Sequence, residues 1–536
     1  MAVDLLTGSK LVAAKAGRWI VNGADLLVRT AVSCGVEVCF ANAGTTELPI
    51  VTAFDSISGI KVFLGLFEGV CTGAADGYGR MLDKPAMALL HLGPGLANGI
   101  ANLHNARRAQ SPVLNVVGEH ATWHRAADPP LAMDIEGLAR TVSGWYRTSK
   151  SVQDIAGDVA EAVASARLGQ VATLIVPNDF QLAECETQTV PACAVSFDPI
   201  DHGFIETIAL RLQSFRKVAL ILGGRALRKP GLDAVSRIRK AIGCDLFTSS
   251  LSGYIDRGPG LPPVERVPYF PEQAAAALSR YEAVLLAGTP EPVTFFGYPG
   301  IRSRIMYDEQ EKITLCTDGQ NVVEALQCLA DALRTPANLK AGDNLFTRLQ
   351  RPSLPEGDLT AEKACLTLAA LQPENAIIVD EAISSGHSYY PISAGLSPHT
   401  ILTLSGGSIG QGIPCATGAA IACPDRPVIN LEADGSAMYT MQALWTQAHE
   451  RLNVVTLICS NRSYRILQME LKRSGISSGL KTRALVELKE PAIEWVRIAE
   501  GFGVPGVTVS TAEAFARELR KALKESGPHL IEILLP

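Results

Sequence analysis

The sequence lacks three features that would each have indicated a particular class of protein. None of its apolar runs approaches the roughly 20 residues that a membrane-spanning helix needs, and residues 1–20 lack the apolar core and cleavage site of a signal peptide. The net charge is −6, and the sequence has no cluster of lysine and arginine. Both observations argue against nucleic acid as a partner. The twelve cysteines are scattered without CxxC or zinc-ligand spacing, as expected for reduced thiols. We therefore expect a cytoplasmic protein with no membrane or nucleic-acid partner.

Composition and length indicate a globular protein of several domains. Charged residues make up 19% of the chain and hydrophobic residues 47%, and 536 residues are too many for one core, so about three domains are expected. Short apolar runs alternate with helical stretches, which predicts an α/β fold of doubly wound, mostly parallel sheets. The predicted domains cover residues 20–190, 204–345 and 358–536, separated by a linker at 190–203 and a polar stretch at 334–357.

Two polar residues, 27 positions apart, close two apolar runs near the C-terminus. The run 427–433 ends at Asp434, and the run 454–460 ends at Asn461. With a helix predicted over 439–452, the segment is a βαβ unit, which brings the carboxyl ends of both strands to one edge of a sheet. A carboxylate and an amide oxygen there suit Mg²⁺, which takes its other ligands from phosphates and water. Polar residues also end strands where no ligand binds, so both interpretations remain open.

A lone carboxylate marks a second candidate site near the N-terminus. The run 61–66 is predicted to be a buried strand, and a helix rich in small residues is predicted over 70–80. Glu68 lies between them, where burial would raise its pKa and favour the protonated form. The alternative is a glutamate in the first turn of a helix, stabilised by the helix dipole.

Short elements along the chain carry a family resemblance. In order they are 40–45 (FANAGT), 67–69 (FEG), 75–78 (ADGY), 91–98 (HLGPGLAN), 406–410 (GGSIG), 434–436 (DGS) and Asn461. Through their order and spacing the chain resembles the thiamine diphosphate-dependent enzymes of the acetolactate synthase, benzoylformate decarboxylase and pyruvate oxidase group, from about Asn22 to the C-terminus. It looks most similar to the acetolactate synthase large-subunit-like homologues.

The resemblance implies a role for each domain. The N-terminal domain would bind the aminopyrimidine ring of thiamine diphosphate, the C-terminal domain would bind the diphosphate and Mg²⁺, and the middle domain would be structural. In this group the cofactor lies between subunits, which implies a homodimer or homotetramer with active sites at the interfaces. Glu68 would protonate the aminopyrimidine so that its exocyclic nitrogen can remove the thiazolium C2 proton. FAD is not expected, because Gly223-Gly224-Arg225 is too short to carry an FAD signal.

The resemblance also assigns individual cofactor contacts. Asp434, Asn461 and the carbonyl of Ser463 would ligate Mg²⁺. Gly407 would accept a hydrogen bond from the aminopyrimidine, and Ile409 would bend the cofactor, although an ordinary core isoleucine is an alternative. The other implied cofactor contacts are Ser384, Ser408, Gly435, Ser436 and Tyr464.

The resemblance implies that His91 and Thr45 are catalytic residues and that Asn98 and Glu470 contact the substrate; a neutral His91 could bind a carboxylate or shuttle a proton. His91 stands where benzoylformate decarboxylase has an active-site histidine, and Thr45 stands where that enzyme has a carboxylate-binding serine; a structural histidine is the alternative for His91. The second histidine of that enzyme has no match, because Phe295-Phe296 occupy its region. Glu470 replaces the substrate-selecting tryptophan of acetolactate synthases. It would either line the pocket or pair with Lys472 or Arg473.

These observations predict a thiamine diphosphate- and Mg²⁺-dependent enzyme that acts on a small 2-oxo acid. The reaction would be decarboxylation, transfer of the resulting acyl unit to a carbonyl acceptor, or both, as in acetolactate synthase. The alternatives are a benzoylformate-type decarboxylase without carboligation and a catalytically degenerate homologue that acts as a regulatory subunit. The family's usual Gly-Asp-Gly is Ala433-Asp434-Gly435 here, and its usual Asn-Asn-Gly is Ser460-Asn461-Arg462. Both metal-binding side chains are retained.

Overall fold

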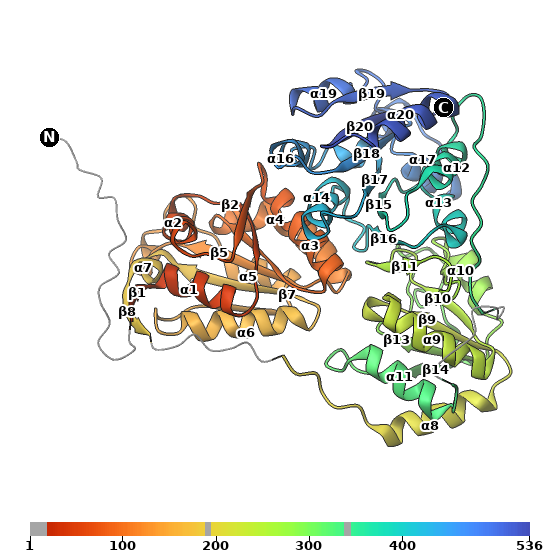
Figure 1. The fold of residues 1–536 in the computed structure, drawn as a ribbon, viewed down its shortest axis with the longest axis horizontal. Helices are drawn as coiled ribbons and strands as arrows, with labels where there is room; N and C mark the ends of the chain where they lie inside the picture. Colours follow the sequence, from red (N-terminus) through yellow and green to blue (C-terminus); the bar gives the residue numbers. More distant parts are fainter. Residues whose placement is uncertain (1–18, 188–194, 337–344) are drawn as a thin grey trace. The chain divides into compact units, whose positions relative to one another are not determined.

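The computed structural model describes residues 19–187, 195–336 and 345–536 (Figure 1). The first residues of the chain and parts of the predicted linker at 190–203 and of the stretch at 334–357 lie outside these ranges. Contacts divide the chain into two compact units, Met1–Val195 and Ser196–Pro536. Within the described ranges, no helix is long and apolar enough to cross a membrane, and no two cysteines form a disulfide.

The first unit is built on a six-stranded parallel sheet with the strand order β3-β2-β4-β5-β7-β6. Its strands are β2 (Val38–Asn42), β3 (Lys61–Leu64), β4 (Ala86–Leu90), β5 (Val113–Glu119), β6 (Trp145–Thr148) and β7 (Val171–Pro177). The short β1 (Trp19–Asn22) and β8 (Glu184–Thr187) form a separate antiparallel pair. The helices are α1 (Gly23–Ser33), α2 (Leu48–Ser56), α3 (Glu68–Leu82), α4 (Leu92–Arg108), α5 (Ile135–Val142), α6 (Ile155–Arg167) and α7 (Asn178–Leu182), with 3-10 turns η1 (Thr45–Glu47) and η2 (Arg125–Ala127).

Helices cover both faces of this sheet. Residues of α1, α2 and α6 share one hydrophobic core with alternate residues of the strands, whereas α3 and α4 pack against each other and contact β2, β4 and β5. The predicted α/β class with parallel sheets is therefore confirmed for this unit.

The strand predicted over 61–66 is present but is not buried. It forms β3 at the edge of the sheet and, among the described strands, pairs only with β2. Phe63 points inward, whereas Val62 and Leu64 are 43% and 46% exposed in the single chain. An apolar run cannot by itself distinguish an edge strand from a central one, which is why the sequence-based expectation was wrong.

Small residues and a buried ion pair hold α3 against α4. A Cβ at Gly99 of α4 would lie 2.8 Å from the Thr72 methyl group of α3, so the glycine permits the close approach. On α3, the fully buried Asp76 accepts hydrogen bonds from Nε and Nη2 of Arg80 at 2.8 and 2.6 Å. The element ADGY is therefore a structural part of α3, and it fixes the helix whose first residue is Glu68.

The second unit contains two sheets. The five-stranded sheet β12-β10-β9-β13-β14 is parallel, and the seven-stranded sheet β11-β16-β15-β17-β18-β20-β19 is parallel except for β11. The strands are β9 (Val218–Leu222), β10 (Asp245–Thr248), β11 (Ile255–Arg257), β12 (Glu265–Arg266), β13 (Ala283–Ala287), β14 (Glu311–Thr314), β15 (Ile377–Glu381), β16 (His399–Thr403), β17 (Val428–Ala433), β18 (Val454–Ser460), β19 (Gly506–Val509) and β20 (His529–Leu534).

Helices flank both sheets of the second unit. They are α8 (His202–Ser214), α9 (Lys229–Ile242), α10 (Pro271–Leu278), α11 (Val322–Ala332), α12 (Ala361–Leu371), α13 (Tyr389–Ile392), α14 (Gly412–Ala422), α15 (Asp434–Ala437), α16 (Ala443–His449), α17 (Arg465–Arg473), α18 (Leu480–Val486), α19 (Trp495–Gly501) and α20 (Ala512–Ala522), with 3-10 turns η3 (Gly224–Leu227) and η4 (Ser393–Gly395). The helix predicted over 439–452 is shorter than expected, because residues 438–442 form turns with hydrogen bonds between residues three apart.

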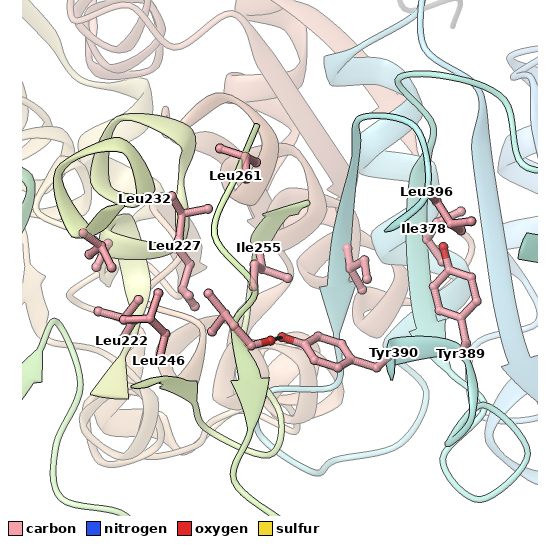
Figure 2. Close-up of a cluster of buried hydrophobic side chains, with 14 of the residues drawn as sticks. Leu222, Leu227, Leu232, Leu246, Ile255, Leu261, Ile378, Tyr389, Tyr390 and Leu396 are labelled. Carbon is pink, nitrogen blue, oxygen red and sulfur yellow. Dashed lines mark hydrogen bonds between the residues drawn. The ribbon is translucent and has the colours of Figure 1, made fainter. Parts of the chain in front are cut away.

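One hydrophobic core joins the two sheets of this unit. Figure 2 shows Leu222 and Leu246 from the five-stranded sheet, Ile378 from the seven-stranded sheet, and Ile255 of β11 between them. Tyr390 belongs to the same cluster and donates a hydrogen bond from its hydroxyl to the Val264 carbonyl at 3.0 Å. This bond ties the C-terminal part of the unit to the residue just before β12 of the five-stranded sheet.

A buried histidine at the start of β16 makes stability depend on pH. Burial lowers the pKa of His399 to about 4, and Nδ1 bonds to the Ser397 carbonyl at 2.8 Å. An unfolded histidine titrates near 6.5, so the unfolded chain binds the extra proton between these values. We expect the free energy of unfolding to fall by up to about 3 kcal/mol as the pH falls from 7 to 4. Urea unfolding of His399→Gln should not show this fall in the free energy of unfolding, whereas the exposed control His202→Gln should still show it.

Candidate functional site

The predicted metal ligands lie at the same edge of the C-terminal sheet. Strands β17 and β18 are neighbours, with Ala433 opposite Cys459, so Asp434 and Asn461 follow adjacent strand ends. The backbone amide of Arg462 donates to Oδ2 of Asp434 at 2.6 Å, and the amide of Ser463 donates to Oδ1 of Asn461 at 2.9 Å. The turn after β18 therefore links both side chains.

Burial changes the acidity of the Asp434 carboxyl. The residue is 2% exposed, and this burial raises its pKa to about 6, although the backbone amides of Arg462 and Gly435 oppose the shift. A cation beside this carboxyl would stabilise its ionised form and lower its pKa.

Other predicted cofactor residues surround this pair. Tyr464 covers Gly435 so closely that a Cβ there would lie 2.5 Å from the tyrosine ring, and Ser436 is buried in the same turn. Asn461 Nδ2 donates to the hydroxyl of Ser385 at 3.4 Å, which brings the turn that contains Ser384 to the same edge.

A glutamate accepts hydrogen bonds from the backbone of the glycine-rich segment after β16. Glu381, the last residue of β15, accepts the backbone amides of Gly410, at 2.7 Å, and of Gly412. Gly407 is exposed with a φ of +74°, a conformation that favours glycine, and Ser408 and Ile409 are half-buried beside it. The segment 406–412 is therefore a turn of fixed shape with Gly407 on its outer side.

A second buried carboxyl lies against Glu381. Burial, and then repulsion by Glu381, raises the pKa of Glu432 well above its usual range, and burial also raises the pKa of Glu381. A Cβ at Gly412 would lie 2.0 Å from Oε2 of Glu432, so only glycine leaves room for this carboxyl. Two like charges this close cannot both ionise in an apolar surrounding, so the pair holds a proton.

Three strained residues adjoin predicted site residues. Leu92, Ile383 and Arg462 have φ values of +53°, +48° and +54°, in the left-handed region that side chains rarely adopt. They follow His91, precede Ser384 and follow Asn461, respectively. Such strain is concentrated at functional sites, where the surrounding structure enforces it.

Relief of this strain is testable at Arg462. The left-handed conformation costs a side-chain-bearing residue about 1–2 kcal/mol, and glycine returns about half of that as backbone entropy. We expect Arg462→Gly to stabilise the cofactor-free protein by about 0.5–1 kcal/mol in urea unfolding. The matched change Arg465→Gly, in the first turn of α17, should destabilise it. Equal destabilisation by both changes would contradict the strain at 462.

The N-terminal unit brings together Glu68, Asn98 and the turn after His91. Glu68 is half-buried as the first residue of α3, and Asn98 Nδ2 on α4 donates to its Oε2 at 3.0 Å. A Cβ at Gly95 would lie 3.5 Å from both Oε1 of Glu68 and Cβ of His91. The carboxyl ends of β2, β3 and β4 thus present these side chains at one edge, where open α/β sheets bind ligands.

His91 is paired with a carboxylate that the sequence did not predict. Nδ1 of His91 lies 2.7 Å from Oε2 of the fully buried Glu47, and the Thr46 hydroxyl lies 3.2 Å from the same nitrogen. Glu47 also accepts the amide of Gly44 at 2.9 Å. Thr45 lies in the same 3-10 turn and is exposed. Glu47 therefore fixes the orientation of the His91 ring.

Glu470 lies on α17 and is paired rather than isolated. Its Oε1 accepts the Tyr298 hydroxyl at 3.1 Å, and its Oε2 lies 3.7 Å from Nη1 of Arg473. The ion pair with Arg473 corresponds to one of the two expected alternatives. Phe295 lies nearby in the same unit, with its ring 3.4 Å from a Cβ built on Gly407.

Two supporting residues were missed by sequence reasoning. Glu381 carries the same signal as Asp434, a polar residue at the end of an apolar run, and could have been found by that rule. Glu47 has only the weaker signal of a glutamate three residues after Gly44, a spacing typical of a capping box.

Comparison with known proteins identifies the class that this fold and these two sheet edges define. Residues 21–138 match the N-terminal TPP binding domain of thiamine pyrophosphate enzymes, and residues 385–533 match their C-terminal TPP binding domain. The chain is 46% identical to the Mycobacterium tuberculosis protein named "Putative acetolactate synthase large subunit IlvX", over 96% of this chain and 99% of that one. It is 26% identical to benzoylformate decarboxylase of Pseudomonas aeruginosa, over 93% and 96% of the two chains.

A solved structure has the same fold. The 4-hydroxybenzoylformate decarboxylase of Rhodococcus jostii, which is thiamine diphosphate-dependent, superposes with a TM-score of 0.83 at 22% identity, over 96% of this chain and 99% of that chain. The chain belongs to the thiamine diphosphate-dependent enzyme family that includes acetolactate synthases and benzoylformate decarboxylases.

Proposed function

We propose that the protein binds thiamine diphosphate with Mg²⁺ and removes CO₂ from a small 2-oxo acid, with or without transfer of the acyl unit to a carbonyl acceptor. The observation that carries this proposal is the arrangement of Asp434 and Asn461 at adjacent strand ends, tied together by the amides of residues 462 and 463. Family membership supports the cofactor and the reaction class.

The donor set fits a magnesium diphosphate. Among the described residues, no group of three or more His, Cys, Asp and Glu side chains could hold a metal ion. The described residues at this edge therefore do not form a metal site made of protein side chains alone. Mg²⁺ commonly takes one or two carboxylate or amide oxygens and completes its shell with phosphate and water. Asp434 and Asn461, with the carbonyl of Ser463, would supply the protein share.

The remaining predicted residues would position the cofactor and the substrate and would transfer protons. Thiamine diphosphate supplies an electron sink for the carbanion that forms when CO₂ leaves a 2-oxo acid. Glu68 would hold and return a proton at its carboxyl, and His91, oriented by Glu47, would bind the substrate with Thr45 and Asn98. The cofactor would be contacted by Ser384, Gly407, Ser408, Ile409, Gly435, Ser436 and Tyr464.

Assembly as a homodimer or homotetramer with shared active sites is part of this proposal, as is a cytoplasmic location. The exposed apolar residues Val62, Leu64 and Leu66 support a second copy, because exposed apolar surface at a sheet edge favours association. Mass measurement in solution tests this assembly.

A decarboxylase without carboligation is the second candidate. The close pair of His91 and Glu47 favours it, because an oriented histidine can return a proton to the product. The deciding experiment supplies thiamine diphosphate and Mg²⁺ with a panel of 2-oxo acids and follows both CO₂ and product identity. Aldehyde alone supports the decarboxylase, a hydroxyketone supports carboligation, and no CO₂ from any acid contradicts the proposed reaction.

Acetolactate formation from pyruvate is expected to be poor. An anionic side chain at 470 would disfavour a second 2-oxo acid, although Arg473 balances part of that charge. We expect Glu470→Trp to raise acetolactate output several-fold, measured by conversion of the product to acetoin in acid. The exposed control Lys472→Trp on the same helix should leave the output unchanged. Efficient acetolactate formation by the unmodified protein would refute this expectation.

A further inference from the structure

Glu381 bonds to the backbone of a segment that is predicted to bind the cofactor, although the sequence analysis gave this glutamate no role. It is the last residue of β15, which lies between β16 and β17 in the C-terminal sheet, and it is 2% exposed. Its two carboxylate oxygens have different partners: Oε1 accepts the amide of Gly410 at 2.7 Å, and Oε2 accepts the amide of Gly412. Both bonds are buried, so a shift of either amide would leave a polar group without its partner, which is unfavourable.

The carboxylate of Glu381 also lies at the start of α14. This helix begins at Gly412, and the first amides of a helix have no partner inside it. An anionic side chain is favoured at this end of a helix by the partial positive charge of the unpaired amides. Glu381 therefore bonds the end of β15 both to the glycine-rich segment and to the first residue of α14.

Thr440 holds the same segment from another side. Its hydroxyl donates to the Gly410 carbonyl at 2.8 Å, and its amide donates to the Ala437 carbonyl at 3.4 Å, so the bond connects the segment to α15, which begins at Asp434. Gly410 has a φ of +97°, and a Cβ there would lie 2.5 Å from Cβ of Tyr439. The amide and the carbonyl of Gly410 are thus both fixed, in a conformation that favours glycine.

These bonds would act on the cofactor through the backbone. Gly407 is predicted to accept a hydrogen bond from the aminopyrimidine, and Ile409 is predicted to bend the cofactor. Both precede Gly410 by no more than three residues, so the bonds to Gly410 and Gly412 restrict where they lie. The diphosphate, by contrast, is proposed to bind at the ends of β17 and β18. The two halves of the cofactor would therefore depend on different parts of the sheet edge.

We propose that Glu381 is a positioning residue for the aminopyrimidine half of thiamine diphosphate, because together with Thr440 it fixes the backbone of the glycine-rich segment. This inference rests on the proposed function. It assigns the affinity for the aminopyrimidine to the end of β15, and it leaves the affinity for the diphosphate with the ends of β17 and β18.

The test compares two ligands, each supplied with Mg²⁺ to the full-length protein. One is thiamine diphosphate, and the other is hydroxyethylthiazole diphosphate, which is the same molecule without its aminopyrimidine. Glu381→Gln keeps the length of the side chain but replaces one acceptor oxygen by an NH₂ donor, so one of the two amides faces a donor. By calorimetry we expect the Kd of thiamine diphosphate to rise about tenfold, the effect of one lost hydrogen bond, and the Kd of the thiazole ligand to stay within about twofold.

Two further variants support this comparison. Thr440→Val removes the bond to the Gly410 carbonyl and should weaken thiamine diphosphate with the same selectivity, which keeps the proposal testable if Glu381→Gln does not fold. Asp256→Asn is the matched control. Its carboxylate lies on β11 of the same sheet and accepts the amide of Lys229 at 2.9 Å and the hydroxyl of Thr400, at the opposite end of β16 from the glycine-rich segment. This change should leave both Kd values unaltered.

Three results would overturn the inference and leave the proposed function standing. Equal weakening of both ligands would mean that Glu381 supports the whole edge, and an unchanged Kd for thiamine diphosphate would mean that its bonds do not matter for the cofactor. If the unmodified protein did not bind the thiazole ligand at millimolar concentration, the two halves would not bind separately. Failure of the unmodified protein to bind thiamine diphosphate with Mg²⁺ would refute both the inference and the proposed function.

Discussion

Replacement of Asp434 by alanine is expected to abolish the stabilisation that thiamine diphosphate gives in the presence of Mg²⁺. A ligand that binds only the native state stabilises it by about 2.7 kcal/mol at 100 times its Kd, so the unmodified protein should melt several degrees higher with both components present. The reason for the loss is specific. Asp434 is the one carboxylate of the proposed metal-binding set, it is 2% exposed, and alanine leaves only the Asn461 amide and a backbone carbonyl.

Two controls make this result decisive. Chelation of divalent ions should remove the shift in the unmodified protein, because the diphosphate is proposed to bind through the metal. Asp425→Ala, which removes an exposed carboxylate from the same unit, should leave the shift unchanged. If Asp434→Ala melted higher with cofactor and Mg²⁺ by the same amount as the unmodified protein, the metal site would not be at this strand end.

The parallel strands were predictable because burial dictates their composition. The run 218–222 is continuously apolar and the run 454–460 is mostly apolar, which is the pattern of strands covered on both faces. Short or polar strands carry no such signal in the sequence, for example β6 with the sequence WYRT and β12 with ER. Their positions depend on which neighbour they pair with, and a sequence window does not contain that information.

The candidate site divides in a similar way. Asp434 and Asn461 could be found because the chain order of a βαβ unit brings both strand ends to one edge. The role of Glu47 could not be found, because it depends on contact with His91, 44 residues away in the chain. Likewise, the sequence left two alternatives for Glu470. Its hydrogen bond from Tyr298, 172 residues distant, comes only from the packing of the second unit.

The departures from the family pattern also have a physical explanation. Arg462 stands where the family resemblance implies a glycine, and its backbone is left-handed, with a φ of +54°. Its amide still donates to Asp434, so the turn retains the geometry that the metal site is proposed to use, at the cost of local strain. At Gly412, by contrast, glycine is required, because a side chain there would collide with the carboxyl of Glu432 beside Glu381.

Replacement of Glu68 by glutamine is expected to lower activity by about 10²-fold or more, a typical size for a general acid–base group. Glutamine has nearly the same shape and can still bond to Asn98, which contacts Oε2 at 3.0 Å. It cannot donate a proton and recover it. Cofactor binding should therefore survive, and the rise in melting temperature with thiamine diphosphate and Mg²⁺ should match that of the unmodified protein.

Exchange of the cofactor C2 proton for deuterium separates a chemical role from a structural one. The exchange rate should fall in Glu68→Gln with the cofactor bound, because proton transfer at this carboxyl is proposed to control removal of the C2 proton. Asn98→Ala provides the matched control: it removes the hydrogen bond to Glu68 but keeps the carboxyl, so its exchange rate should fall much less. Equal exchange rates in the unmodified protein and in Glu68→Gln would mean that this glutamate only supports the start of α3.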